Sequence, residues 1–345
     1  MYSSVLSVGI DAISTLRPVD VLASGMPFFR ERIAKHVLDE ALEFARLLGI
    51  GVGDKNPDNT LVPGIQNVLE LHLMPPAVDV SALLALGLTA ANLQIASVDA
   101  PYVHPYNLFF RNIARRLKLG ENPVKIFAEE LGWGMLNERR YEEWVDTVNS
   151  SLYAMNSLSP NPFFLRLCLE HIRGDFGYRR YLRELLNTYP TLRLLVEPNA
   201  KYIQNFSDWV EAVRQASEDF GEGRIGLSLD PGHLLQVFGA SPSSVLRFTE
   251  RLLEDRDAGM VCLMEVSGAR IDPNGAVQTH LLPTREEGNQ INWFDIMSYY
   301  AKAHREGRLP STGPRLVYEV PPNKWGSFKR EAREITERFA KPFIN

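Results

Sequence analysis

The chain has 345 residues and a formal net charge of −5, with 45% hydrophobic and 23% charged residues. This length suits one large α/β domain or two small ones, and the composition is that of an ordinary soluble globular protein. The net charge argues against a general attraction to nucleic acid or to an anionic membrane. No apolar stretch is long enough to span a bilayer, and MYSSVLSVGIDA lacks basic residues ahead of its apolar ones, so we expect neither a membrane span nor a secretory signal.

The two cysteines, Cys168 and Cys262, both lie inside apolar runs. Buried free thiols are more common in such runs than a disulfide is. Free thiols suit a reducing compartment, so we expect a cytoplasmic protein.

The first half of the chain alternates short apolar runs with amphipathic stretches. Short runs that end at Gly, Pro, Asn or Asp are typical of buried strands, and apolar residues at three- and four-residue steps are typical of helices. Strands are predicted at 5–10, from 68, at 92–101 and at 163–169, and helices at 28–48, 80–88 and 178–187. Further helical stretches within 106–160 exceed what one barrel helix needs, so we predict a helical insertion after the third strand.

The second half repeats one design four times: an apolar run, an acidic residue, and then Pro or Gly. Continuous apolar runs are typical of buried parallel strands, and Pro or Gly marks the end of the strand. The four runs are RLLVEPN with Glu197, IGLSLDPGH with Asp230 and His233, VCLMEVSG with Glu265, and RLVYEVPP with Glu319. Helices are predicted at 206–219, 241–253, 293–304 and 325–339, and a long polar loop at 270–290.

Eight strand signals that alternate with helices predict an α/β fold, the (β/α)8 TIM barrel. The sequence contains no solenoid-type repeat, no low-complexity segment and no linker that would divide two domains. We therefore predict a single domain over 1–345, with the helical insertion at 106–160.

The acidic residues at the strand ends predict a metal site. The C-terminal ends of barrel strands converge on one face, where several carboxylates would repel one another unless a cation held them. A single acid at a strand end usually caps a helix or pairs with a lysine, but four in consecutive units favour a shared metal site. Oxygen ligands with one imidazole suit Mn, Mg, Co or Zn. The predicted ligands are Glu197, Asp230, Glu265, His280 and Glu319.

Two of these ligands have alternatives. Glu265 could instead pair with Arg166 or Arg270. His280 lies in a polar segment, THLLPTREEGNQINW, and a loop histidine is usually exposed to solvent. Its segment belongs to the predicted catalytic face, so both interpretations stay open.

Other polar residues near the strand ends are candidates for substrate contact. Asp99 follows the third strand, with a structural role as its alternative. Glu170 and His171 follow the fourth strand, and strand alternation turns one of the two inward.

These motifs resemble the xylose isomerase-like superfamily, which includes sugar isomerases, keto-sugar epimerases and AP endonucleases of the endonuclease IV type. The resemblance covers most of the chain and is sharpest over 192–320. VEPN resembles the family's fifth-strand glutamate, LDPGH its sixth-strand Asp-x-x-His, and VYEV its eighth-strand glutamate. THLLPTREEGNQINW is similar to the family's stretch after strand seven, and DAPYV to its turn after strand three.

Three positions depart from the family pattern. Glu265 stands where strand seven usually carries a histidine, and Asp99 where the strand-three turn usually carries one. Gln278 stands where an aspartate is expected two residues before His280. With the negative net charge, these departures count against an abasic-site nuclease, although a carboxylate can replace imidazole for a harder cation.

The resemblance implies a metal-dependent isomerase or epimerase whose small-molecule substrate is a sugar or a related polyhydroxylated carbonyl compound. Glu197 and Glu319 would exchange the proton next to the carbonyl through a metal-stabilised enediolate. His233 and Arg270 would hold substrate oxygens. The alternatives are a metal-dependent phosphodiesterase or AP endonuclease of the endonuclease IV type, and a non-catalytic barrel that binds a ligand or partner. A homo-oligomer is compatible with all three.

Overall fold

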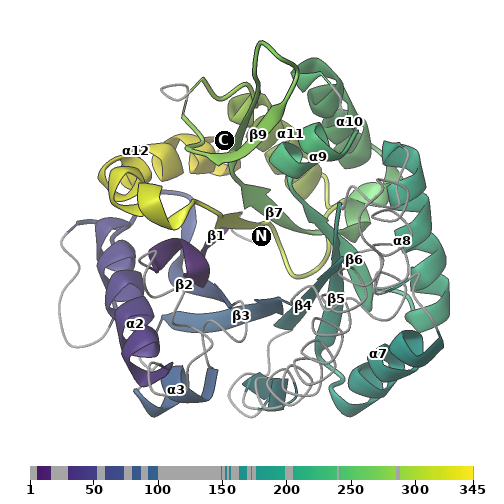
Figure 1. Ribbon diagram of the computed structural model, residues 1–345, viewed down its shortest axis with the longest axis horizontal. Helices are drawn as coiled ribbons and strands as arrows, with labels where there is room; N and C mark the ends of the chain where they lie inside the picture. Colours follow the sequence, from purple (N-terminus) through teal and green to yellow (C-terminus); the bar gives the residue numbers. More distant parts are fainter. Residues whose placement is uncertain are drawn as a thin grey trace, which may run out of the picture.

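Eight parallel strands form a closed barrel in the computed structural model of the chain (Figure 1). Their order around the barrel is β1-β10-β7-β6-β5-β4-β3-β2, so the first and last strands pair and close it. The predicted TIM-barrel fold is thereby confirmed. The structure describes residues 6–16, 30–52, 59–73, 80–86, 92–99, 163–168, 176–198, 205–238, 241–284 and 288–344, with isolated positions at 149, 152, 153, 155, 156 and 172.

Most residues of the barrel strands are buried, on both faces of each strand. In β1, all six residues of LSVGID are buried, because the Leu, Val and Ile side chains belong to the main apolar core while the Ser, Gly and Asp positions alternate with them and face the barrel interior. The strands are β1 (Leu6–Asp11), β2 (Ile65–Leu73), β3 (Leu93–Asp99), β4 (Phe163–Cys168), β5 (Leu192–Glu197), β6 (Ile225–Leu229), β7 (Val261–Val266) and β10 (Arg315–Tyr318).

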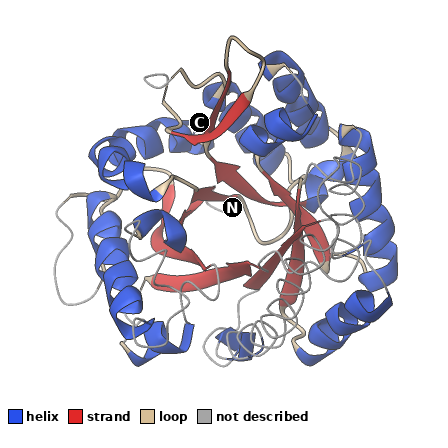
Figure 2. Ribbon diagram, viewed as in Figure 1, coloured by secondary structure: helices blue, strands red, loops and turns tan. Residues whose placement is uncertain are grey.

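Helices surround the barrel and cover the outer faces of the strands (Figure 2). Their apolar sides join the strands in one large core, in which Phe44, Tyr318 and Phe328 pack ring against ring. The α-helices are α2 (Arg30–Leu47), α3 (Val80–Ala85), α7 (Phe176–Thr188), α8 (Phe206–Phe220), α9 (Pro231–Phe238), α10 (Pro242–Glu254), α11 (Trp293–Arg305) and α12 (Trp325–Ile344). Single 3-10 turns occur at η1 (Ala12–Thr15), η3 (Arg256–Met260) and η5 (Pro322–Lys324).

The prediction of a polar loop at 270–290 is wrong for the first half of that range. β8 (Gly268–Ile271) and β9 (Val277–Leu281) form an antiparallel hairpin there. Asp272 organises the turn, because its side chain accepts a hydrogen bond from the N–H of Asn274 at 2.8 Å. The two strands are short and the turn residues DPNG separate them, so the sequence pattern resembles that of a loop.

The predicted helical insertion at 106–160 lies outside the described residues, apart from helical positions between 149 and 156. Its existence therefore stays a prediction. Among the described helices, none combines the length and the apolar character needed to cross a bilayer.

Cys262 is a buried free thiol, as predicted. Burial raises the pKa of this thiol to about 11, so its reactive thiolate form is scarce at neutral pH. The side chain of Cys168 lies outside the described part of the chain.

The barrel interior holds an apolar cluster beside a buried ion pair. The cluster comprises Phe164, Leu195, Cys262, Leu263 and Val317. The ion pair joins Glu70 of β2 to Arg315 of β10, and the guanidinium carbon of Arg315 lies 5.1 Å from the centre of the Phe164 ring. A charge buried this deeply is tolerated only with a partner, so this pair is a structural element of the barrel floor.

Gly9 of β1 lies where a side chain would not fit. A Cβ at this position would stand 2.6 Å from Nε2 and 2.8 Å from Cδ2 of the buried His72 ring. We expect Gly9→Ala to lower the free energy of unfolding by about 1–3 kcal/mol, because a packed interior cannot accommodate the extra methyl group without displacement. Denaturant unfolding of the purified variant would measure this.

Gly51→Ala is the matched control for that variant. Apart from its two chain neighbours, no atom of the described residues lies within 4 Å of a Cβ at Gly51. We expect this variant to be unchanged or more stable by up to about 1 kcal/mol, because alanine restricts the unfolded chain. Equal unfolding free energies for the two variants would contradict the tight packing at Gly9.

Candidate active site

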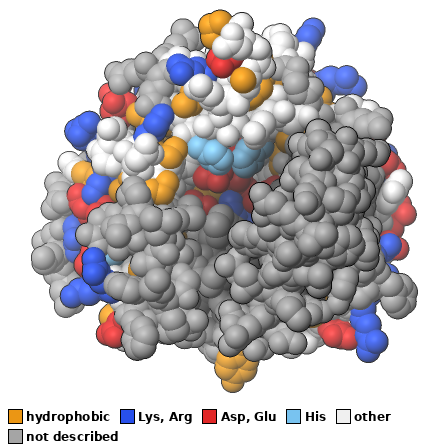
Figure 3. Space-filling model, viewed as in Figure 1, with side chains coloured by type: hydrophobic (Ala, Val, Ile, Leu, Met, Phe, Trp, Pro, Cys, Tyr) orange, Lys and Arg blue, Asp and Glu red, His pale blue; other side chains and the backbone are white. Residues whose placement is uncertain are grey.

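Three carboxylates from neighbouring strands meet at the mouth of the barrel. One oxygen each of Asp230, Glu265 and Glu319 lies within 4.8 Å of the other two. Asp230 directly follows β6, Glu265 is near the end of β7, and Glu319 directly follows β10. In Figure 3, acidic and histidine side chains gather in the central hollow of this face. The structure thus brings together three of the five predicted metal ligands.

Asp230 is held by the start of a helix that we did not predict. Pro231 begins α9, and Asp230 caps it: its Oδ1 accepts the N–H of His233 at 3.0 Å. Pro231 and Gly232 are also a strong turn signal, but Asp followed by Pro is a common helix start. The buried Oδ2 lies 3.1 Å from Nδ1 of His233, yet no described donor makes a hydrogen bond to it.

Glu265 is fully buried and pairs with Arg166, which is one of the two arginines named as its alternative partners. It accepts a hydrogen bond from the Ser228 hydroxyl, and its Oε1 lies 3.2 Å from Nη1 of Arg166. Burial alone would raise the pKa of Glu265, but the charge of Arg166 and the Ser228 hydrogen bond outweigh it and lower the pKa. Arg270 bonds to the side chain of Gln278 instead, at 2.9 Å.

Glu319 has a buried carboxylate oxygen, Oε2, that receives no hydrogen bond from the described residues. Burial raises the pKa of Glu319 well above its usual value, and the negative charges of Glu265, Asp230 and Asp11 raise it further. The carboxylate therefore requires a positive charge beside it or a proton on it.

The donor set fits a divalent cation. Carboxylate oxygens are preferred ligands of Mg and Mn and acceptable ones for Zn and Co. Two of these oxygens, on Asp230 and Glu319, are buried without a hydrogen-bond donor among the described residues, which is costly unless another positive group meets them. Asp230, Glu265 and Glu319 are therefore the residues best placed to hold such an ion.

Two histidines flank this cluster. Nε2 of His233 lies 3.3 Å from Nε2 of His280, and the rings meet edge to face. Nδ1 of His280 lies 3.7 Å from Oε1 of Glu319, and His280 has a left-handed backbone with φ of 54°. Burial, and then the neighbouring His233, lower the pKa of His280. His280 thus borders the three clustered acids rather than joining them.

Glu197 ends β5 and also borders the cluster. Its side chain is 23% exposed, and its Oε1 lies 3.7 Å from Nε of Arg166. Arg166 itself is buried in β4 and lies 2.8 Å from Oδ2 of Asp11 in β1. Neither Arg166 nor Asp11 is among the residues predicted for the site. An arginine inside the apolar strand FFLRLC was the available signal, because a buried guanidinium needs acidic partners.

The predicted substrate contacts are described only in part. Glu170 and His171 lie outside the described residues, and so does the side chain of Asp99, which ends β3. Arg270 lies on the hairpin β8–β9, and His233 lies in the mouth. Their roles stay predictions.

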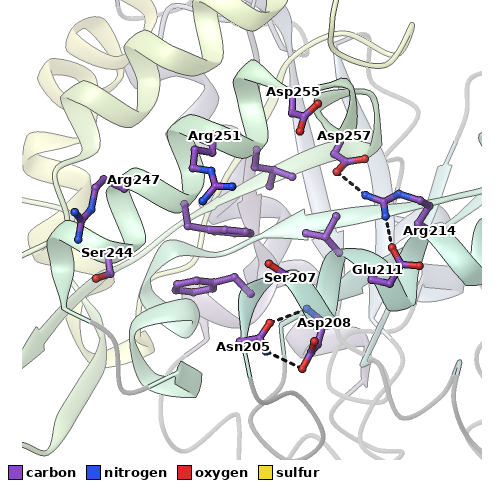
Figure 4. A pocket seen from close by; sticks show the side chains of 14 residues that line it. Asn205, Ser207, Asp208, Glu211, Arg214, Ser244, Arg247, Arg251, Asp255 and Asp257 are labelled. Carbon is purple, nitrogen blue, oxygen red and sulfur yellow. Dashed lines mark hydrogen bonds and ion pairs between the residues drawn. The ribbon is translucent and has the colours of Figure 1, made fainter.

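A separate groove of about 820 Å³ lies between α8 and α10 on the outer wall (Figure 4). Its floor is the stacked pair Phe206 and Phe248, whose ring centres are 4.3 Å apart. Arg214 at its edge is held by Glu211 and Asp257. This groove contains none of the predicted site residues, so the candidate active site is the mouth of the barrel.

Comparison with known proteins supports the fold. No protein-family model matches the chain, and no curated relative was found. Among solved structures, a D-tagatose 3-epimerase-like protein is similar to this chain, with 12% sequence identity and a TM-score of 0.50. The alignment covers 97% of this chain and 99% of that protein. The two share a barrel fold. The predicted resemblance to the xylose isomerase-like superfamily is confirmed as a likeness of fold.

Two further structures match at lower scores. An L-ribulose 3-epimerase matches 98% of this chain and 93% of its own, at 13% identity and a TM-score of 0.46. For a D-allulose 3-epimerase from Methylomonas sp., in complex with D-allulose, the alignment covers 99% of this chain and 94% of that protein. The sequence identity is 11% and the TM-score 0.47. At these identities the neighbours say nothing about individual site residues.

Proposed function

We propose that the chain is a divalent-metal-dependent isomerase or epimerase of a sugar or a related small polyhydroxylated carbonyl compound. The observation that carries this proposal is the cluster of Asp230, Glu265 and Glu319 at the barrel mouth, with two buried oxygens that lack donors among the described residues. The shared fold with a D-tagatose 3-epimerase-like protein supports the substrate class. A cytoplasmic location stays a prediction.

The ion would be held by Asp230, Glu265 and Glu319, with Glu197 and His280 at the border of the site. A bound Mn, Mg, Co or Zn ion supplies Lewis acidity, which polarises a substrate carbonyl and stabilises the charge that develops when the neighbouring C–H proton leaves.

The proton itself would be moved by Glu197 and Glu319. Glu197 ends β5 and Glu319 follows β10. Strands β6 and β7 lie between them in the barrel, so the two carboxylates approach the mouth from different sides. One removes the proton from the carbon next to the carbonyl and the other returns it, which inverts or relocates that centre. Arg166 lies beside Glu197, with its Nε 3.7 Å from Oε1 of the carboxylate.

The substrate would be oriented by polar side chains around this pair. His233 lies in the mouth beside Asp230, with Nδ1 at 3.1 Å from Oδ2. We propose that His233 and Arg270 hold substrate oxygens. Asp99, Glu170 and His171 are further proposed contacts.

Exchange of solvent deuterium into candidate sugars tests the proposal. We expect exchange at the carbon next to the carbonyl with at least one member of a broad sugar panel. Removal of metal with EDTA should abolish exchange, and one of Mn, Mg, Co or Zn should restore it, because the three clustered acids cannot polarise a carbonyl themselves. Absence of exchange and of turnover with every added metal would contradict the proposal.

One observation favours a second candidate, a phosphodiesterase or AP endonuclease. His233 and His280 place two imidazole nitrogens 3.3 Å apart beside the acids, and such a pair can bind a further ion. Gln278 and the net charge of −5 argue against this candidate. Two or three ions per chain with cleavage of abasic DNA would favour it, whereas a protein that binds no metal would favour a non-catalytic barrel.

A further inference from the structure

Arg166 places one fixed positive charge at the centre of the acidic mouth. It is 2% exposed, and all three of its guanidinium nitrogens face carboxylates from three different strands. Nη2 lies 2.8 Å from Asp11, Nη1 lies 3.2 Å from Glu265, and Nε lies 3.7 Å from Glu197. A planar guanidinium is suited to several acids at once, whereas an ammonium group is a single point charge.

The mouth therefore has two halves that share Glu265. In one half the guanidinium of Arg166 meets Asp11, Glu197 and Glu265. In the other half, Asp230 and Glu319 keep buried oxygens without a hydrogen-bond donor among the described residues. The first half holds a guanidinium, whereas the acids of the second half have only the imidazoles of His233 and His280 beside them.

We propose that Arg166 acts as the second cation of the mouth, so that the site accepts a single divalent ion and Glu197 is held in position. The place of that ion, between Asp230, Glu265 and Glu319, rests on the proposed function. A second ion would have to separate a buried guanidinium from its acids or stand beside its charge, and both are costly. The mouth is therefore built for one-ion chemistry, not for a cluster of two or three ions.

Arg166 is a positioning residue in this scheme, because it acts through Glu197 and does not touch the substrate. Glu197 is 23% exposed at the end of β5, so it faces the mouth, while its Oε1 faces the buried guanidinium. This contact restricts the carboxylate to one side of the mouth. Lysine at position 166 would keep the charge but could not face all three acids.

The number of bound ions per chain tests the proposal. Wild type, Arg166→Met and Arg166→Lys would be saturated with Mn or Zn, freed of excess metal, and measured by elemental analysis and by calorimetric titration. We expect one ion in wild type and two in Arg166→Met, whose first ion also binds at least tenfold more tightly, since a nearby positive charge is gone. We expect Arg166→Lys to bind one ion, with kcat lowered at least tenfold.

Two further variants keep the test decisive. Arg180→Met changes an arginine that is 75% exposed, and should bind one ion with the affinity of wild type. If Arg166→Met does not fold, Asp11→Asn/Arg166→Met removes the guanidinium without changing the net charge of the mouth, and should also bind two ions. Circular dichroism of each variant would establish that it is folded.

The outcomes separate this inference from the proposed function. One ion in wild type, and one ion of unchanged affinity in a folded variant without Arg166, would overturn the inference alone. Two or more ions in wild type would also overturn it. A wild type that binds no divalent ion would remove both the proposed function and this inference.

Discussion

Glu319→Gln is expected to lower kcat/KM about a hundred- to ten-thousandfold, which is the usual contribution of a proton-transferring group. The same variant should raise the stability of the metal-free protein. Burial and three nearby carboxylates oppose the ionised form of Glu319, and its Oε2 receives no hydrogen bond from the described residues. Glutamine has the same shape, carries no charge, and can donate to the neighbouring acids. We expect a gain of about 1–3 kcal/mol in the free energy of unfolding.

Lower activity together with higher stability distinguishes a functional acid from a structural one. Turnover would be measured on the sugar that shows deuterium exchange, and stability by denaturant unfolding in EDTA. Glu334→Gln is the matched control, because that side chain is 75% exposed, and it should change neither quantity measurably. A Glu319→Gln protein that is less stable than wild type would assign Glu319 a structural role, and one with full activity would exclude it from the chemistry.

The acids of the mouth could be located from the sequence because each ends an apolar run and precedes Pro or Gly. That pattern places Glu265 and Glu319 at strand ends whatever the details of the barrel. Once the strands close in order, β6, β7 and β10 are neighbours, so Asp230, Glu265 and Glu319 come together. The roles assigned to these residues are still predictions, whereas their convergence follows from the topology.

Arg166 shows what the sequence could not provide. Alternation along FFLRLC turns it to the interior of the barrel, but its partners depend on register between distant strands. Asp11 lies 155 residues away in sequence and reaches Arg166 across the barrel, from β1 to β4. Such a contact has no local pattern.

Local signals were also missed where two interpretations competed. Pro231 and Gly232 are a strong turn signal, yet these residues begin α9, with Asp230 as its capping residue. His280 was expected in a loop and lies instead in β9 with a left-handed backbone. Both errors arose where polar residues of the site replaced the apolar pattern that marks helices and strands.

Arg315→Met is expected to lower the free energy of unfolding by about 3–5 kcal/mol, because it leaves the Glu70 carboxylate buried and uncompensated. Glu70 is fully buried, and Arg315 and Gln94 both donate to its Oε1. Arg180→Met, which breaks an exposed pair one helical turn apart, should cost no more than about 0.5 kcal/mol. Urea unfolding at neutral pH would measure both.

The same pair should make the barrel sensitive to acid. Burial would raise the pKa of Glu70, but the charge of Arg315 and the adjacent His72 outweigh it and lower the pKa to about 2, from 4.5 for an ordinary glutamate. A depressed pKa stabilises the fold fully above pH 4.5, and that contribution is lost as the pH falls toward 2. The difference corresponds to about 3 kcal/mol at most.

The double variant Glu70→Gln/Arg315→Met isolates this contribution. Both charges are gone, so the variant should recover much of the stability lost in Arg315→Met alone, and it should lose less stability than wild type between pH 4.5 and pH 2. Equal losses in this pH range would mean that Glu70 does not titrate with the fold. Because Arg315 begins β10, which pairs with both β1 and β7, the same variants also report whether closure of the barrel depends on this charge pair.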